Sequence, residues 1–481
     1  MYLCLFFLPE SPPGAGSREL KKICRMKRIA LPAFLLSLVV CLAPPCVSGQ
    51  PGPANRFRRS LAGVLSGIEE RFDVRIDCRK FSPDTLALDF AEMRIRPWSV
   101  SETLDEVTRP LDLKWSHRGG NRYRIELYEY YRRTPEQGRR ILEWLSAEYD
   151  DRESWERRRA AVLREARERL DMQPLYDSLA ADPQVFLGEV RRFDGYTTQG
   201  YALETLPGVF VCGTVYAPIR PGGRRPLIVS PAGHWPGGRL RPDQQYRMAT
   251  FARMGAVAVD LDIVGWGDGA RTVPFPHEDP RSMRLQALWS KAVTDWAVAS
   301  RPEIDTTRMA ATGGSGGATH VLLLALQDDR FRVLAPVVHL VAHFDGGCPC
   351  ESAVPLSTVA GGSCIPELLA AVAAPNPLLA VSDSGDWTAS WPESEYPYLQ
   401  RIWGFYGAAE RVRNVHLPDE RHDYGANKRR AVYEFFAREL GLDLDRADES
   451  RVTVQEEGAL RSFPEGAPVP AGRRVKYGKR R

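Results

Sequence analysis

Short apolar segments alternate with helical segments over residues 186–442, and this alternation limits the possible folds more than any other feature of the chain. Strand-like runs occupy 201–206, 209–216, 227–229, 256–260, 309–312, 334–338, 378–381 and 412–415. Helical segments fall between them, near 243–253, 281–300, 317–327, 393–406 and 428–440. Short apolar strands separated by helices predict an α/β fold with a doubly wound, mostly parallel sheet that is covered on both faces.

One turn within this pattern carries a candidate nucleophile. Residues 313–317 read Gly-Gly-Ser-Gly-Gly, directly after the apolar segment 309–312 and before the helical segment 317–327. Glycines permit the tight strand-to-helix turn that lifts a serine hydroxyl above the sheet. The sequence therefore predicts that Ser315 is the nucleophile of a catalytic site.

A serine hydroxyl becomes nucleophilic when an adjacent imidazole takes its proton. His422 lies in a polar loop between the last predicted strand and the last predicted helix, where an α/β-hydrolase places its base. We expect His422 to be this base. His416, at the end of the last strand, is expected to be packing or hydrogen-bonded scaffold.

A carboxylate must orient that imidazole, and two aspartates compete for the role. Asp383 and Asp386 both follow the strand 378–381. We favour Asp386 because the orienting acid usually follows a glycine-containing turn a few residues beyond the strand. The resulting order of Ser, Asp and His is the one that α/β-hydrolases share.

Acyl transfer also needs two donors directed at the developing oxyanion. The backbone N–H of Gly316, directly after the nucleophile, is the first candidate. The second is expected from the loop at 230–238, and we assign it to the backbone of His234, with Trp235 as the alternative.

Six stretches together resemble the acetyl xylan esterase and dienelactone-hydrolase-like branch of bacterial α/β-hydrolases. They lie at 231–238, 262–268, 301–305, 312–317, 342–351 and 384–388, and the resemblance covers about half of the chain. It implies hydrolysis of esters, often acetyl groups on plant polysaccharides, by the triad assigned above. Ala232 departs from the pattern, since many relatives carry a histidine before the oxyanion glycine.

Aromatic side chains at the same end of the sheet are candidates for contacts with a sugar. We expect substrate contacts from Trp235, Trp266, His343 and Trp387, with buried packing as the alternative for each. We expect no cofactor and no metal, and the partner is a small-molecule or polysaccharide ester.

The beginning of the chain predicts an export signal. Met26-Lys27-Arg28 precedes an apolar run at 29–42 and small residues at 47–49, which is the pattern of a secretory signal peptide. Residues 1–49 are therefore interpreted as an upstream extension followed by a signal peptide, and the protein is expected to be secreted or periplasmic.

Export permits disulfides. Cys348, Cys350 and Cys364 lie close together in the sequence, and we predict that Cys364 is oxidised to one of the other two. A zinc site that includes His343 is the weaker alternative, because the spacing does not match a closed tetrahedral set.

Three further segments flank or precede the catalytic domain, which is assigned to 186–445. Residues 50–130 follow a helix-strand-strand-helix-strand-strand order and resemble the short N-terminal domain of secretins and TonB-dependent receptors, which implies an envelope protein partner. Residues 131–185 predict a helical connector. Residues 446–481 predict a basic, disordered tail, and the charge distribution does not resemble a nucleic-acid-binding face.

Two other functions are possible from the sequence, and one feature argues against each of them. An exported peptidase of the prolyl oligopeptidase type would carry a propeller, for which the residues before 186 are too few. A non-catalytic envelope interaction protein would not need Ser315, Asp386 and His422.

Overall fold

The computed structural model describes residues 57–463, except 80–81, 112, 128–132, 220–221, 353 and 355, and the backbone of 473–476. The chain forms two compact units that divide between residues 128 and 129. The predicted signal segment at 1–49 lies outside the described residues. Among the helices that are described, none is long and apolar enough to cross a membrane.

The first unit contains the predicted helices and strands and one further strand, β1, before the first helix. A three-stranded sheet has the order β2-β5-β4, and β1 pairs with β3 beside it. Leu61 and Ile68 of one helix pack with Leu104 and Val107 of the other in a small apolar core. The elements are β1 (Arg58–Ser60), α1 (Leu61–Phe72), β2 (Arg75–Arg79), β3 (Ala87–Asp89), α2 (Val100–Thr108), β4 (Leu113–His117) and β5 (Arg122–Leu127).

The second unit is built on an 11-stranded sheet that contains all eight predicted strands. Its order is β15-β14-β13-β12-β10-β11-β9-β8-β6-β16, with β7 paired to β8. The six strands from β10 to β15 pair in parallel with one another. The strands are β6 (Gln184–Leu187), β7 (Arg191–Arg192), β8 (Tyr196–Leu206), β9 (Val209–Pro218), β10 (Arg225–Pro231), β11 (Val257–Leu261), β12 (Ile304–Gly314), β13 (Phe331–Val337), β14 (Leu378–Asp383), β15 (Val412–Leu417) and β16 (Arg473–Lys476).

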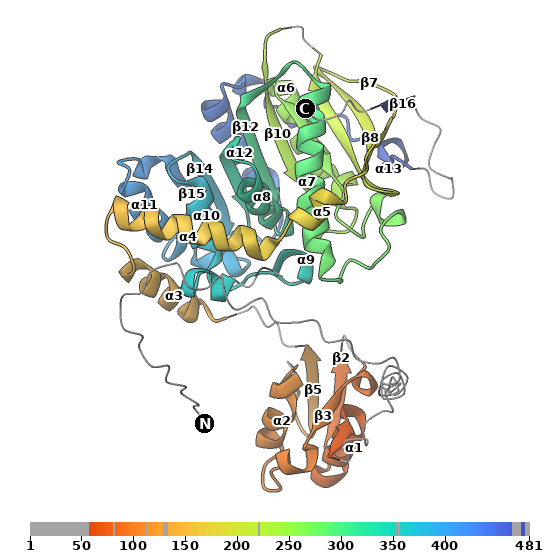
Figure 1. Cartoon of the computed structure of the whole chain (residues 1–481), viewed down its shortest axis with the longest axis vertical. Helices are drawn as coiled ribbons and strands as arrows, with labels where there is room; N and C mark the ends of the chain where they lie inside the picture. The colour runs from red at the N-terminus through yellow and green to blue at the C-terminus, as the bar shows by residue number, and fades with distance from the viewer. Residues whose placement is uncertain are drawn as a thin grey trace, which may run out of the picture. The chain divides into compact units, whose positions relative to one another are not determined.

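Helices cover both faces of this sheet (Figure 1). Alternate residues of β10 enter different cores: Leu227 and Val229 belong to the core that includes residues of α7, α8, α10 and α11, whereas Ile228 belongs to the core that includes residues of α6 and α12. This alternation follows from the two-residue period of a strand. The helices are α6 (Pro242–Met254), α7 (Arg281–Ser300), α8 (Gly316–Gln327), α9 (Pro349–Ser352), α10 (Ile365–Ala373), α11 (Glu395–Gly404) and α12 (Ala426–Leu440). The predicted α/β-hydrolase fold is confirmed.

The segment expected to be a connector contributes to the core of the second unit. It forms α3 (Pro135–Ala147), α4 (Arg152–Leu170) and α5 (Gln173–Asp177). Trp155 and Val162 of α4 are fully buried in the larger core. Arg158 of α4 also forms an ion pair with the buried Glu367 of α10 at 2.9 Å. These helices therefore belong to the compact unit that contains the site.

The prediction of a disordered tail from residue 446 is wrong for its first part. Residues 446–463 include α13 (Glu457–Leu460). Leu460 and Phe463 are buried, and the Phe463 ring meets Phe210 edge to face at a centroid distance of 5.9 Å. Phe463 thus packs on β9, although the residues that follow it are rich in basic side chains.

Candidate active site

Ser315 lies in a strained turn between β12 and α8. Its backbone has φ 55° and ψ −128°, a conformation that a residue with a side chain rarely adopts. The turn needs small neighbours because a Cβ on Gly313 would lie 2.5 Å from the carbonyl carbon of Gly317. The Ser315 N–H donates to the carbonyl of Val337 at 3.0 Å, which fixes the turn to β13. The predicted nucleophile thus occupies a nucleophile elbow.

The imidazole of His422 lies within hydrogen-bonding distance of both Ser315 and Asp386. The Oγ of Ser315 is 3.0 Å from Nε2 of His422. The Nδ1 of the same ring is 2.5 Å from Oδ2 of Asp386. Three segments that are far apart in the sequence therefore meet at the carboxyl ends of parallel strands.

The two competing aspartates have different partners. Oδ1 of Asp386 accepts hydrogen bonds from the backbone and hydroxyl of Thr388, and Oδ2 remains directed at the imidazole. Asp383 instead pairs with Nζ of Lys428 at 3.1 Å, and both side chains are fully buried. Burial, and then the nearby Asp386, raise the pKa of Asp383. The geometry supports the predicted choice of Asp386.

Two tryptophans flank the imidazole of His422. The ring of Trp387 is 4.4 Å from it and the ring of Trp235 is 5.4 Å from it, centroid to centroid. A hollow of about 1000 Å³ opens beside His422 and Trp387. Its other lining residues come from α3, from the segment just before α3 and from the loops after β13 and β14: Arg133, Pro135, Glu136, Arg139, His343, Ser384, Gly385, Asp386, Ala389, Ser390, Glu393 and Ser394.

The other two residues predicted to contact the substrate, His343 and Trp266, do not contact the imidazole of His422 as the two tryptophans do. His343 lines the hollow but is only 3% exposed. Its carbonyl accepts a hydrogen bond from the Arg133 N–H at 2.6 Å. Trp266 packs against the rings of His234 and His277, at centroid distances of 5.7 and 5.6 Å.

The loop after β10 touches the elbow closely. A Cβ on Gly233 would lie 2.4 Å from the carbonyl oxygen of Gly314, and one on Gly316 would lie 2.4 Å from Cε1 of His234. Backbone amides of this loop can therefore approach an oxygen bound above Ser315. Burial, and then His277, lower the pKa of His234 to about 4, so its imidazole is neutral at neutral pH.

The predicted cysteine pairing is wrong. Cys348 bonds to Cys350, and Cys364 is a free, buried thiol at the N-terminus of α10. Cys364 packs in the larger apolar core, whereas the other two sulfurs face the imidazoles of His234 and His277.

Sequence reasoning did not identify His277, His339 and Glu351 as site residues. Oε2 of Glu351 lies 3.6 Å from Nδ1 of His234 and 3.8 Å from Nε2 of His339. His339 follows the carboxyl end of β13, and polar residues at that end of parallel strands are the signal that could have identified it. His277 lies in a long loop without such a signal.

Comparisons with known proteins place this geometry among esterases. No family model matches the chain, and no curated protein matches it. Among solved structures, the methylesterase BT1017 is 47% identical, with coverage of 86% of this chain and 93% of that chain and a TM-score of 0.72. An acetyl xylan esterase from Paenibacillus sp. R4 is 18% identical over 57% of this chain and 94% of that chain, with a TM-score of 0.38. A glucuronoyl esterase from Solibacter usitatus is 12% identical over 62% of this chain and 94% of that chain, with a TM-score of 0.40.

Proposed function

The chain belongs to the α/β-hydrolase family that includes the methylesterase BT1017, and we propose that it is an exported serine esterase that acts through Ser315, His422 and Asp386. The observation that carries this proposal is the unbroken series of contacts from Ser315 Oγ through the imidazole to the carboxylate. The expectation of export rests on the signal segment at 29–42.

The reaction begins when Ser315 Oγ attacks the ester carbonyl carbon. Nε2 of His422 takes the hydroxyl proton, and Asp386 accepts the Nδ1 hydrogen bond that keeps this tautomer in place. Collapse of the tetrahedral intermediate releases the alcohol, which takes the proton from Nε2. Water then attacks the acyl-enzyme by the same route, releases the acid and restores Ser315.

The oxyanion of each tetrahedral intermediate needs donors that are already in place. We assign them to the backbone N–H groups of Gly316 and His234. The contact between the His234 ring and Gly316 supports this assignment, because it brings the loop after β10 against the turn that carries the nucleophile.

Methyl esters of carboxylic acids are the first candidate substrates, because the relative that is 47% identical is a methylesterase. A hollow of about 1000 Å³ is far larger than a methyl group, so the acid portion would occupy it. Trp387 offers that portion an aromatic wall, which suits a sugar ring.

Acetyl esters on carbohydrate are the second candidate, favoured by the sequence stretches at 231–238 and 384–388 that resemble acetyl xylan esterases. The two candidates differ in the product that leaves first. A methyl ester releases methanol when Ser315 is acylated, whereas an acetyl ester releases the sugar hydroxyl and then acetate.

Quantifying methanol and acetate separates the candidates. Purified protein is incubated with methyl-esterified uronic acid polymers and with acetylated xylan, and Ser315→Ala is the matched control. We expect Ser315-dependent methanol release. Ser315-dependent release of acetate alone would support the second candidate, and release of neither product above the control would refute the proposed activity.

We also propose that the first unit binds a protein of the cell envelope. Its resemblance to secretin and TonB-receptor modules supports this, as do the exposed side chains of Met93 and Trp98, which are 75% and 72% exposed. Cross-linking in intact cells should capture a partner with the wild-type protein and not with a Met93→Ser, Trp98→Ser variant.

A further inference from the structure

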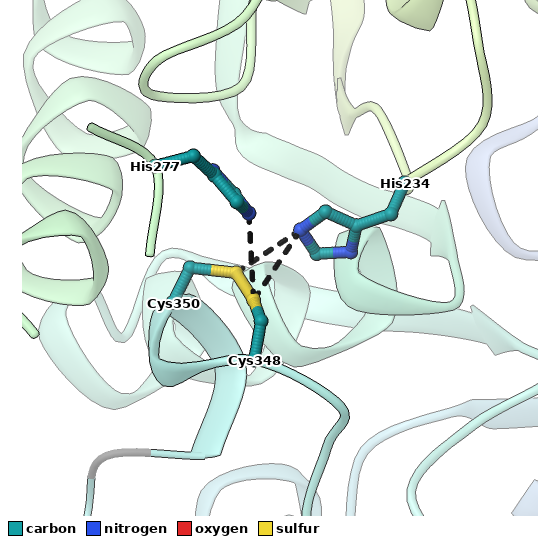
Figure 2. A group of neighbouring side chains, drawn as sticks. All are labelled: His234, His277, Cys348 and Cys350. Carbon is teal, nitrogen blue, oxygen red and sulfur yellow. Dashed lines mark hydrogen bonds between the residues drawn. A yellow bond between two sulfur atoms is a disulfide. The ribbon is translucent and has the colours of Figure 1, made fainter. Parts of the chain in front are cut away.

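Four side chains with metal-binding atoms converge near the turn that carries Ser315. His234, His277, Cys348 and Cys350 each place one nitrogen or sulfur within 4.8 Å of the others. Figure 2 shows both imidazoles pointing at the two sulfurs from different loops. The triad does not use this cluster, although His234 belongs to the loop that touches Gly316.

We propose that, when Cys348 and Cys350 are reduced, these four side chains bind a Zn²⁺ ion through two sulfurs and two Nε2 atoms. Two cysteines and two histidines make up one of the usual ligand sets of a structural zinc site. The inference does not depend on the esterase activity proposed above.

The distances between the ligand atoms suit a tetrahedral ion. Zinc bonds of about 2.3 Å to sulfur and about 2.0 Å to nitrogen, at tetrahedral angles, place sulfur and nitrogen about 3.5 Å apart. The observed distances are 3.7 Å from Cys348 Sγ to His234 Nε2, 3.4 Å from Cys348 Sγ to His277 Nε2 and 3.0 Å from Cys350 Sγ to His234 Nε2. The two sulfurs, which are bonded to each other in the structure, would also have to separate to about 3.8 Å once they are reduced.

The second ring nitrogen of His277 is held by a hydrogen bond, and that of His234 lies near a carboxylate. Nδ1 of His277 is 2.7 Å from the carbonyl oxygen of Val264, and since a carbonyl only accepts, Nδ1 carries the proton. Nε2 of His277 therefore carries a lone pair, which is directed at Sγ of Cys348. Nδ1 of His234 lies 3.6 Å from a carboxylate oxygen of Glu351. A carbonyl or carboxylate behind each imidazole is the usual arrangement around metal-bound histidine.

The sulfur pair has a competing oxidised state. Cys348 and Cys350 form a disulfide in the structure (Figure 2). Only Pro349 separates them, so this bond closes a very short loop and restricts the unfolded chain little. An ion bound by all four ligands would instead join three segments: the loop after β10, the loop between β11 and α7, and α9.

Zinc uptake requires reduction of that disulfide, and a phosphine supplies it. The phosphine gives two electrons to the disulfide and takes the oxygen of a water molecule, and the two protons of that water convert the sulfurs to thiols. Zn²⁺ then displaces both protons as it binds the thiolates. This expectation replaces the sequence-based one that the chain binds no metal.

The test measures zinc bound to the full chain after phosphine treatment, exposure to zinc chloride and gel filtration. Cys348→Ser, Cys350→Ser and His277→Gln each remove one ligand. Cys364→Ser is the matched control, because Cys364 is a buried thiol outside the cluster. Circular dichroism verifies that each variant is folded, and the three serine variants change only one atom each.

We expect about one zinc per chain in the wild type and in Cys364→Ser, and a loss of at least tenfold in the three ligand variants. X-ray absorption at the zinc edge should show sulfur at about 2.3 Å and nitrogen at about 2.0 Å. Zinc content in the reduced wild type no higher than in Cys348→Ser, or an absorption spectrum without sulfur ligands, would overturn the proposal.

Discussion

Asp386 places Oδ2 2.5 Å from Nδ1 of His422, while Asp383, three residues earlier, faces Lys428. The two carboxylates follow the same strand, yet only one of them can orient the imidazole. The structure thereby gives the two aspartates separate roles that mutation can distinguish.

Replacing each aspartate by asparagine should affect a different property of the protein: activity for Asp386 and stability for Asp383. Asp386→Asn lowers kcat by about 10³- to 10⁴-fold, because the amide no longer holds the tautomer that accepts the Ser315 proton. Asp383→Asn leaves the Ser315 and His422 contacts intact but weakens the buried pair with Lys428, so it lowers the free energy of unfolding. Steady-state kinetics and urea unfolding measure the two effects. The assignment of the acid fails if Asp383→Asn is the less active variant.

The helix α4 should stabilise the catalytic unit through one buried ion pair. Arg158→Met leaves Glu367 buried without its partner, which should lower the free energy of unfolding by about 3–5 kcal/mol. Arg157→Met is the matched control, since the pair of Arg157 with Glu153 is largely exposed and should contribute less than about 1 kcal/mol. Urea unfolding of both variants checks this. Equal losses would mean that α4 is the connector predicted from the sequence.

A buried histidine on α8 should make the protein sensitive to acid. Burial, and then nearby histidines led by His234, lower the pKa of His320 to about 3, whereas in the unfolded chain it is near 6.5. Between these values the unfolded state binds the extra proton, so stability is lost as pH falls from about 6.5 towards 3. His320 contributes a slope of about 1.4 kcal/mol per pH unit in that window.

His320→Leu should flatten the dependence of unfolding free energy on pH by about that amount. Urea unfolding between pH 4 and pH 7 measures the slope, and His117→Leu, at an exposed position of the first unit, is the control. An unchanged slope in His320→Leu would show that this imidazole does not stay neutral in the folded protein.

Two tryptophans should differ in their effect on substrate binding. Trp387 lines the hollow beside His422, so Trp387→Leu should raise KM by about 2- to 10-fold. Trp266 packs on His234 and His277, so Trp266→Leu should leave KM nearly unchanged. The proposed location of the substrate is wrong if KM rises equally in both variants.

The parallel sheet and the triad could be predicted because local signals specify them. Buried parallel strands are short, continuous apolar runs, and the Gly-Gly-Ser-Gly-Gly turn needs glycines at fixed positions. The edge strand β16 and its neighbour β6 carried no such signal. β16 pairs with β6 through Arg473–Lys476, a basic stretch that resembles a solvated tail.

The cysteine and histidine cluster could not be predicted because its members come from three segments that are far apart in the sequence. Spacing in the sequence placed Cys364 beside Cys348 and Cys350, yet the fold buries Cys364 at the N-terminus of α10 and brings His277 to the sulfurs from 71 residues away. His343, the histidine considered with them from the sequence, lines the hollow instead. Contacts of this kind depend on where loops pack, which local patterns do not encode.

The central claim is that Ser315 is the nucleophile of an esterase. The most direct measurement combines a fluorophosphonate probe with peptide mapping by mass spectrometry, together with hydrolysis of a methyl ester by the wild type and Ser315→Ala. We predict that the probe modifies Ser315 and no other residue, and that Ser315→Ala loses both the labelling and activity by about 10⁴-fold. Labelling at another residue, or a Ser315→Ala variant that hydrolyses the ester at the wild-type rate, would contradict this account.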